Sequence, residues 1–402
     1  MADLPESCDV LIVGGGPAGL AAAARLKRLG VGAVHLLERE SETGGIPRHC
    51  AHSPYGLREF GRLMSGPAFA RRLTAATVAA GAYLHRQATV TALHPGGRVS
   101  LTTPEGVAEV TARAVLLATG VRETPRAPRL VGGTRPGGVL NTGALQGLVH
   151  LDGLKPFDRP LIVGTEPVAF SALLTCRQAG MRPVAMVEPA ARITARAPFR
   201  AVPLALGVPV WLGTALVAIH GTERVEAVTL AAGGTCREVS VDGVVFTGGF
   251  RPENALLRAS HLAVDPGTRG PQVDQYGRCS DPAYFAAGNL LRAVETAGWC
   301  WAEGRAVGRA IVAHLAGRLP PREAAQAVTV EGAGLAWVLP QRIAPPGGPP
   351  AALPRLQVRA AKVFDGDLLL GGRRHRLVAR PERRMTFDLP GFGETAIRLQ
   401  PR

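Results

Sequence analysis

A glycine-rich segment near the amino terminus has the spacing of a phosphate-binding loop. Its glycines fall as G-x-G-x-x-G at Gly14, Gly16 and Gly19, between the apolar run 9–13 and an alanine-rich stretch that predicts a helix. The first glycine allows a tight turn, the second lets a pyrophosphate approach the backbone, and the third lets the helix pack against the strand. The positive end of the helix would then hold the phosphate charge. The alternative is a glycine-rich turn in an unrelated α/β protein.

An acidic residue follows the next predicted strand. The run 34–37 is apolar apart from one histidine, and Glu38 comes directly after it. A carboxylate at this place hydrogen-bonds the ribose of a dinucleotide in folds of this kind. A lone G-x-G-x-x-G is a weak signal, whereas strand, glycine turn, helix, strand and acid in this order favour a dinucleotide site.

A third group of polar residues lies in the loop 43–50, which reads Thr-Gly-Gly-Ile-Pro-Arg-His-Cys. Its glycine pair suits a loop that passes close to the rest of a bound dinucleotide. Arg48 and His49 are natural partners for a phosphate or for the edge of a flavin ring, and with Cys50 they are the candidates for catalytic chemistry. The alternative for these residues is a solvated loop, and the sequence shows no convincing general base.

The chain repeats the strand–turn–helix–strand pattern at 160–188 with an altered turn. By position this turn is a second dinucleotide fingerprint, but it reads Gly164-Thr165-Glu166, so a glutamate replaces the middle glycine. A carboxylate there would crowd a pyrophosphate, and like charges ~4 Å apart repel by about 1–4 kcal/mol near a protein surface. We therefore predict that this unit keeps the fold but binds NAD(P)H poorly or not at all. The competing interpretation is that Glu166 rotates away and Glu188 still holds a ribose.

Between the two units, the pattern changes to short strands with turns at 95–97 and 104–106. These turn signals predict a small antiparallel insertion over 89–115 rather than another βαβ unit. The insertion ends in an apolar run that leads to Ala-Thr-Gly at 118–120. The small residues of that tripeptide can lie against a cofactor.

A later segment is expected to return to the first unit. The apolar run 284–287 predicts a strand, and Gly288 and Asn289 follow at its carboxyl end, the edge at which such sheets bind ligands. A helix then begins near Thr296 and Ala297. The N-terminus of a helix at this place can stabilise negative charge on a reduced flavin ring.

Residues from 319 onward have a different character. The proline-rich segments 320–321 and 345–350 indicate linkers or rigid turns. Short strand-like runs between and after them predict a small β-rich domain with basic turns at 373–376 and 383–384. We find no catalytic constellation in it. A docking surface for a partner and a simple capping domain are both kept as interpretations.

Composition excludes several functions. None of the six cysteines is spaced as C-x-x-C, so spacing offers no metal ligand set and no redox dithiol. No uncharged apolar run reaches ~18–20 residues, so no transmembrane segment is predicted. The glycine motif begins too early for a signal peptide, which favours a cytoplasmic protein. The net charge is +15, but its arginines are mixed with acids. An acidic partner protein is therefore favoured over nucleic acid.

With these motifs placed, residues 8–315 resemble the flavoproteins that carry two dinucleotide-binding domains, a superfamily that includes the disulfide reductases. The resemblance rests on the first glycine motif with its acid, on 118–120, on the second unit and on Ala-Ala-Gly-Asn at 286–289. It implies FAD at the first motif, with Asn289 where relatives usually place an aspartate on the ribityl chain. Because C-x-x-C is absent, disulfide reductase activity is not expected.

A closer resemblance is to the FAD-bearing subunits of heteromeric amine dehydrogenases. These are the A subunit of opine oxidase, the B subunit of hydrogen cyanide synthase and the α subunit of dye-linked proline dehydrogenase. The segments 44–49, 119–125, 135–146 and 295–299 carry this resemblance. It implies a second FAD-containing subunit that oxidises the substrate and, as a further partner, a small ferredoxin-like subunit. No cysteine follows Cys300, so an iron–sulfur cluster held by this chain alone is not expected.

The expected fold is α/β, with two Rossmann-like dinucleotide-binding domains, the second inserted in the first, and a small β-rich C-terminal domain. The FAD-binding domain is expected to comprise 1–125 and 264–318. The NAD(P)-binding-like domain with the degenerate fingerprint is expected at 126–263, and the C-terminal domain at 319–402.

The resemblance implies an FAD-binding subunit of a heteromeric oxidoreductase of the amine, amino-acid or opine dehydrogenase type, which relays electrons from a partner's flavin site or completes it. The alternatives are a self-sufficient NAD(P)H-dependent flavin reductase and a non-catalytic structural subunit. FAD is the expected cofactor; NAD(P) and metal ions are not expected. The residues expected to bind FAD are Gly14, Gly16, Pro17, Ala18, Gly19, Glu38, Arg39, Gly45, Arg48, Thr89, Val90, Thr119, Gly120, Gly288, Asn289, Thr296 and Ala297.

Overall fold

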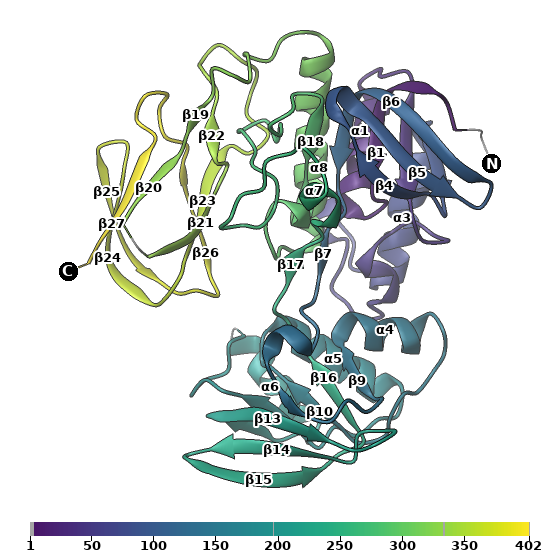
Figure 1. The fold of residues 1–402 in the computed structure, drawn as a ribbon, viewed down its shortest axis with the longest axis vertical. Helices are drawn as coiled ribbons and strands as arrows, with labels where there is room; N and C mark the ends of the chain where they lie inside the picture. The colour runs from purple at the N-terminus through teal and green to yellow at the C-terminus, as the bar shows by residue number, and fades with distance from the viewer. Residues whose placement is uncertain (1–3, 196, 333, 402) are drawn as a thin grey trace.

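The computed structural model describes residues 4–195, 197–332 and 334–401, which fold into three lobes (Figure 1). The first two lobes are each built around a largely parallel sheet, and the C-terminal lobe consists of β-strands. None of the helices in this described part of the chain is long and apolar enough to span a membrane.

The first lobe contains a seven-stranded sheet. Its strands are β1 (Ser7–Val13), β2 (Val34–Glu38), β3 (Tyr83–Arg86), β4 (Thr89–Leu93), β5 (Arg98–Thr103), β6 (Gly106–Leu117) and β18 (Tyr284–Ala286). Strands β3, β2, β1, the second half of β6, and β18 pair in parallel, whereas β4, β5 and the first half of β6 are antiparallel. The predicted antiparallel insertion and the predicted return of 284–287 to this sheet are both confirmed.

Three helices share one buried apolar cluster on one face of this sheet: α1 (Pro17–Arg28), α3 (Gly66–Ala79) and α8 (Ala297–Leu315). The alanines of α1 make it thin enough for α8 to approach closely, and a Cβ atom on Gly304 would collide with the carbonyl oxygen of Ala18. The short helices η1 (Ile46–His49), α2 (Leu57–Phe60) and η5 (Gly288–Leu290) lie in the loops around them.

The second lobe has a five-stranded parallel sheet in the order β12-β11-β10-β16-β9. Its strands are β9 (Val139–Asn141), β10 (Pro160–Val163), β11 (Ala185–Glu188), β12 (Val210–Leu212) and β16 (Gly243–Phe246). Its helices are α4 (Thr142–His150), α5 (Pro167–Gln178) and α6 (Ala201–Ala205). A smaller sheet contains β8 (Gly132–Gly133), β13 (Thr214–His220), β14 (Ala227–Ala232) and β15 (Thr235–Ser240).

Two short strands connect the first two lobes. β7 (Val121–Arg122) pairs antiparallel with β17 (Arg251–Pro252), and both run between the upper and lower lobes in Figure 1. After β17 the chain enters α7 (Ala255–Arg258) and returns to the first sheet. The second sheet is therefore inserted in the chain of the first lobe, as the order of motifs predicts.

The C-terminal lobe is formed by two small sheets and one strand pair. Its strands are β19 (Gln326–Ala327), β20 (Thr329–Glu331), β21 (Leu335–Leu339), β22 (Arg342–Ile343), β23 (Arg355–Ala360), β24 (Phe364–Leu370), β25 (Arg373–Ala379), β26 (Arg384–Asp388) and β27 (Ala396–Pro401). Trp337, Leu339 and Leu353 from this lobe enter an apolar cluster of the first lobe. The predicted β-rich character is confirmed.

The prediction of basic turns in this lobe is wrong for 373–376 and for Arg384. It is right for Arg383, whose backbone N–H donates to the carbonyl oxygen of Arg380 at 2.9 Å. Residues 373–376 belong to β25, which pairs with β24. The turn between these strands is made by Gly371 and Gly372, whose φ angles of 53° and 69° suit a two-residue hairpin loop. Arg384 likewise begins β26 and lies outside the turn. A run of arginines can form a strand because the guanidinium groups of the side chains remain in solvent.

Candidate functional site

The first glycine turn leaves an open space above its middle glycine. A Cβ atom on Gly14 would lie 2.5 Å from the carbonyl oxygen of Ala118, and one on Gly19 would collide with the carbonyl oxygen of Gly14. No described atom lies within 4 Å of the Cβ position of Gly16. Gly16 is the N-cap of α1, Pro17 opens its first turn, and no described side chain caps the helix. The turn therefore combines tight backbone packing below with room for a phosphate group above.

The carboxylate of Glu38 is held at the edge of this turn. It accepts hydrogen bonds from the backbone N–H groups of Gly15 at 2.9 Å and Glu40 at 3.0 Å, and the residue is 8% exposed. The loop after β2 folds back over the turn, so that a Cβ atom on Gly45 would lie 2.9 Å from the Cα atom of Gly16. The structure thus brings together the predicted pyrophosphate and ribose positions.

Two further predicted segments border the same turn. Gly288 has a φ of 73° and lies against Ala18, where a Cβ atom would come within 2.9 Å of the alanine methyl group. Thr119 donates a hydrogen bond of 2.9 Å to the carbonyl oxygen of Glu253, next to β17. Gly120 follows with a φ of 75°. The carboxyl ends of β6 and β18 therefore meet the start of α1.

The side chain of Asn289 is engaged within its own loop. Its Nδ2 donates to the carbonyl oxygen of Glu295 at 3.1 Å, and its Oδ1 accepts from the backbone N–H of Glu295 at 2.7 Å. Both polar atoms of the amide thus fix the residue that precedes the start of α8. This role in loop closure was not expected from the sequence.

The N-terminus of α8 has no compensating charge in its own first turn. Thr296 is the N-cap but makes no side-chain cap bond, and the first turn from Ala297 onward contains no acidic residue. From α2, the carboxylate of Glu59 approaches Gly298, where a Cβ atom would lie 2.5 Å from it. The carboxylate of Glu59 therefore supplies counter-charge from outside the helix to its positive end.

Three of the predicted residues lie farther from the turn. Arg39 is exposed and forms an ion pair with Glu40 at 3.5 Å. Val90 is buried in the apolar cluster below the sheet, and Thr89 is exposed at the start of β4. The backbone N–H of Ala88 donates to the carbonyl oxygen of Glu38, so this strand starts beside the acid.

The three candidate catalytic residues lie where the first lobe contacts α4 of the second. Arg48 forms an ion pair with Glu42 at 3.4 Å. His49 has a buried Nδ1 without a hydrogen-bond partner among the described residues, and burial lowers its pKa, so the ring is neutral at neutral pH. The thiol of Cys50 donates to Oε1 of Gln146 at 3.4 Å, and burial raises the pKa of Cys50 to about 11. A thiol in this state is a poor nucleophile.

A chain of hydrogen bonds continues from this contact into the second lobe. Nε2 of Gln146 donates to Oγ of Ser171 at 2.6 Å, and Ser171 shares a hydrogen bond of 2.7 Å with Nε2 of His52. Nearby, Oε2 of Glu123 accepts from the N–H of Gly143 at 2.7 Å, and burial raises the pKa of this carboxyl group. Sequence reasoning missed these partners because they are far apart in the chain.

The second glycine turn is filled by its glutamate. The carboxylate of Glu166 lies against Gly164 and Gly248, where added Cβ atoms would collide with it or come close to it. Its Oε1 is buried without a hydrogen-bond partner among the described residues, and burial raises the pKa of the carboxyl group. The side chain therefore packs into the turn, between Gly164 and Gly248.

The second acid keeps the arrangement of the first with one change. Glu188 accepts from the backbone N–H of Ala190 at 3.0 Å, as Glu38 does from the residue two positions later. Its other oxygen accepts from the hydroxyl of Thr165 at 2.6 Å, where the first turn offers a backbone N–H. Each acid thus accepts hydrogen bonds at both carboxylate oxygens, and the second turn differs in using a side-chain hydroxyl at one of them.

No group of three or more histidine, cysteine, aspartate or glutamate side chains within 4–195, 197–332 and 334–401 is arranged to hold a metal ion. The first turn, by contrast, combines an open backbone with a nearby carboxylate. Its chemistry fits a dinucleotide, with a bare backbone for phosphate and a carboxylate for ribose.

The sequence profile of the pyridine nucleotide-disulphide oxidoreductases matches residues 8–306, so the chain belongs to this family. The resemblance to flavoproteins with two dinucleotide-binding domains, and with it the prediction of an FAD-dependent oxidoreductase, is confirmed.

Curated relatives include two proteins of Rhizobium meliloti (strain 1021). The A subunit of opine oxidase is 32% identical over 200 residues, which is 49% of this chain and 42% of the relative. The alpha subunit of sarcosine oxidase is 28% identical over 346 residues, which is 81% of this chain and 32% of the relative. The chain thus spans less than half the length of each of these relatives.

Solved structures share the fold. Thioredoxin reductase from T. acidophilum has a TM-score of 0.63 at 18% identity, with 77% of this chain and 99% of that chain covered. L-proline dehydrogenase from P. horikoshii has a TM-score of 0.60 at 20% identity, with 77% of this chain and 56% of that chain covered. The predicted α/β fold class is confirmed.

The thiol of Cys50 is expected to be inert near neutral pH. Since its pKa is raised to about 11, only a small fraction is thiolate at lower pH, and its alkylation by iodoacetamide should accelerate as pH rises toward that value. Cys236 is exposed and provides the control. Mass spectrometry of labelled peptides at about pH 8 should show Cys50 reacting at least ~100-fold more slowly. Equal rates would restore Cys50 as a candidate nucleophile.

Proposed function

We propose that this chain is an FAD-binding subunit of a heteromeric oxidoreductase of the amine, amino-acid or opine dehydrogenase type, which relays electrons from a partner's flavin site or completes it. The observation that carries the proposal is the contrast between the two turns. No described atom lies within 4 Å of the Cβ position of Gly16, whereas the corresponding residue of the second lobe is Glu166, whose carboxylate packs against Gly164 and Gly248. One open turn in a family of flavin-dependent enzymes supports FAD as the bound dinucleotide.

The residues of the first turn would hold this cofactor. Gly14, Gly16 and Gly19 would form the pyrophosphate cradle at the positive end of α1, and Glu38 would bind the adenosine ribose. Because the Asn289 side chain is engaged with its own loop, its contribution to the ribityl chain would come from the backbone. A bound FAD would supply the capacity to accept and pass on electrons.

The proposal of a partner rests on the relatives and on the state of the candidate residues. Two similar proteins are named as subunits, of opine oxidase and of sarcosine oxidase. Within this chain, Arg48 is ion-paired, and His49 and Cys50 are engaged in the contact between lobes. This arrangement favours electron transfer over substrate oxidation here. A second FAD-containing subunit would oxidise the substrate, and a small ferredoxin-like subunit would be a further component.

We also propose that the second lobe has lost nucleotide binding. The carboxylate of Glu166 is buried in the turn, and the hydroxyl of Thr165 already bonds the acid that would hold a ribose. Of these two features, the carboxylate of Glu166 is the one that would oppose a pyrophosphate at this turn. The domain bounds 1–125 with 264–318, 126–263 and 319–402 are kept as part of this proposal.

The purified chain is expected to bind about one FAD at the first turn. Gly16→Val places a side chain in the phosphate space and should weaken FAD binding about 10–100-fold, the equivalent of ~1–3 kcal/mol of steric crowding. Gly391→Val is the matched control, because no described atom lies within 4 Å of that Cβ position either. Fluorescence titration with FAD measures both. A colourless protein that takes up no FAD would favour the alternative of a purely structural role.

NADH and NADPH are expected not to reduce the FAD-loaded protein under anaerobic conditions. Glu166→Gly removes the side chain that fills the second turn and should raise affinity for NADH about tenfold or more, since one like charge at ~4 Å costs about 1–4 kcal/mol. Glu223→Gly, at an exposed loop position of the same lobe, is the control. Rapid bleaching of the parent flavin by NADH would instead identify a self-sufficient reductase.

A tagged chain is expected to co-purify from its native source with a second flavin-containing polypeptide. Mass spectrometry of the complex and assays with amines, amino acids and opines test this expectation. The complex should oxidise one of these substrates, and the isolated chain should not. Full dehydrogenase activity of the isolated chain would overturn the heteromeric assignment.

A further inference from the structure

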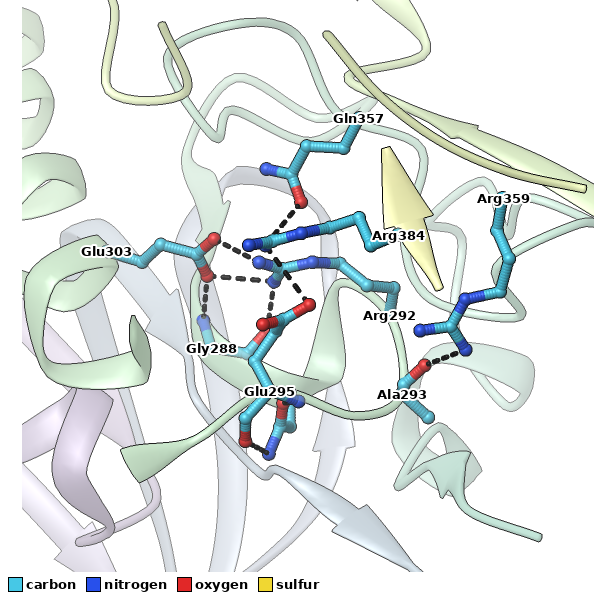
Figure 2. A network of polar contacts seen from close by, with 9 residues as sticks. Gly288, Arg292, Ala293, Glu295, Glu303, Gln357, Arg359 and Arg384 are labelled. Atoms are coloured by element: carbon cyan, nitrogen blue, oxygen red, sulfur yellow. Dashed lines mark hydrogen bonds and ion pairs between the residues drawn. The ribbon is translucent and has the colours of Figure 1, made fainter. Parts of the chain in front are cut away.

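The loop between β18 and α8 is held from the inside by a buried ion pair. Arg292 is fully buried and binds the carboxylate of Glu303 through both terminal nitrogens, one of them at 2.9 Å (Figure 2). The same pair holds Gly288 at both backbone groups. Its N–H donates to Glu303 at 3.2 Å, and its carbonyl oxygen accepts from Arg292 at 3.3 Å. The first residue of the loop is thus fixed to α8.

The C-terminal lobe holds the other end of this loop. Arg384, the first residue of β26, forms an ion pair with Glu295 at 3.0 Å, and the two side chains are only 16% and 10% exposed. Arg384 also donates to Oε1 of Gln357 at 3.1 Å. From β23, Arg359 donates to the carbonyl oxygen of Ala293 at 3.1 Å. Figure 2 shows these arginines converging on the loop from the side of the C-terminal lobe.

A tryptophan in the first turn of α8 extends the contact. The guanidinium of Arg384 lies over the ring of Trp299 at 4.9 Å from its centroid, and that of Arg58 from α2 lies over the same ring at 4.5 Å. Cation–π contacts of this kind are favourable. Arg384 therefore contacts both the residue before the N-cap of α8 and a residue of its first turn.

The cluster carries a net positive charge. Among the described residues, the carboxylates that neighbour Arg292, Arg359 and Arg384 are those of Glu295 and Glu303. Arginine stays protonated in proteins, so the balance is one positive charge when both acids are ionised. Burial raises the pKa of Glu295, and the neighbouring Arg292 and Arg384 oppose this effect. The surplus charge lies beside the positive end of a helix, where the two fields add.

A buried ion pair contributes little net free energy to the attachment of one lobe to another. Removing two charges from water costs several kcal/mol, and an apolar contact of similar size often stabilises as well. This lobe already has such a contact, because Trp337, Leu339 and Leu353 enter the apolar cluster of the first lobe. Attachment of the lobe therefore does not require the buried charges at the start of α8. We relate them instead to the cofactor site that this helix end borders.

We propose that Arg384 of the C-terminal lobe is a positioning residue of the flavin site, which fixes the start of α8 through Glu295 and Trp299 and stabilises the negative charge of reduced FAD. This inference rests on the proposed binding of FAD at the first turn. It gives the C-terminal lobe a role in setting the flavin potential, beyond that of a cap or a docking surface.

The test compares Arg384→Gln and Glu295→Gln in the FAD-loaded protein at about pH 8, well above the ordinary pKa of a glutamate side chain. Removing the cation should lower the midpoint potential of the flavin, and removing the anion should raise it. Each shift is expected to correspond to about a tenfold change in relative affinity for reduced over oxidised FAD, or ~30 mV for a two-electron couple. Arg355→Gln is the control, because Arg355 forms an exposed ion pair with Asp388 in the same lobe.

Opposite shifts show that the charges themselves act on reduced FAD, because loss of the contact alone is the same in both variants and would move the potential in the same direction or not at all. Arg384→Lys keeps the charge and should retain a potential close to that of the parent. If Arg384→Gln does not fold, Arg384→Lys and Glu295→Gln still decide the question. Potentials that are unchanged or shifted in the same direction would overturn the inference. A parent protein that binds no FAD would overturn the proposed function instead.

Discussion

The structure depends on the absence of side chains where three segments meet the start of α1. The carbonyl oxygen of Ala118 lies against Gly14, the loop after β2 lies against Gly16, and Gly288 lies against Ala18. Adding a methyl group at several of these points would place it on a backbone atom, which a packed interior cannot absorb. The strand ends, the loop and α8 therefore converge on one bare turn, and that convergence forms the candidate cofactor site.

The second lobe has the same architecture, but its turn carries side chains where the first turn has glycines. It keeps the strand, helix, strand and acid, and Glu188 even repeats the bond that Glu38 makes to the backbone two residues later. However, the hydroxyl of Thr165 replaces a backbone donor, and the carboxylate of Glu166 occupies the turn. The packing of the sheet is thus preserved although the side chains at the turn differ.

Local signals were sufficient to predict the fold class and the first turn. A glycine spacing, a short apolar run and an acid at a strand end are each defined by a few adjacent residues, so the sequence shows them directly. The contact between Cys50 and Gln146 joins residues 96 positions apart, and no periodic pattern in the sequence predicts such a pair. The wrong prediction at 373–376 has a local cause. The arginines there were predicted to form a turn, but the turn is formed by the preceding Gly371 and Gly372.

The ion pairs of the C-terminal lobe fall into two groups, exposed pairs on its outer surface and a buried pair at the start of α8. Its outer ion pairs, such as that between Arg398 and Glu331, are about half exposed, and surface pairs of this kind contribute little to stability. The pair formed by Arg384 and Glu295 is largely buried, and it lies at the start of the helix whose positive end borders the candidate site. A lobe attached only by apolar side chains would have no electrostatic interaction with a charged cofactor. A lobe that brings a buried cation to this helix end responds to that charge, because low dielectric surroundings extend the reach of its field. In the proposed arrangement, the lobe farthest from the glycine turn in sequence therefore takes part in the same electrostatic site.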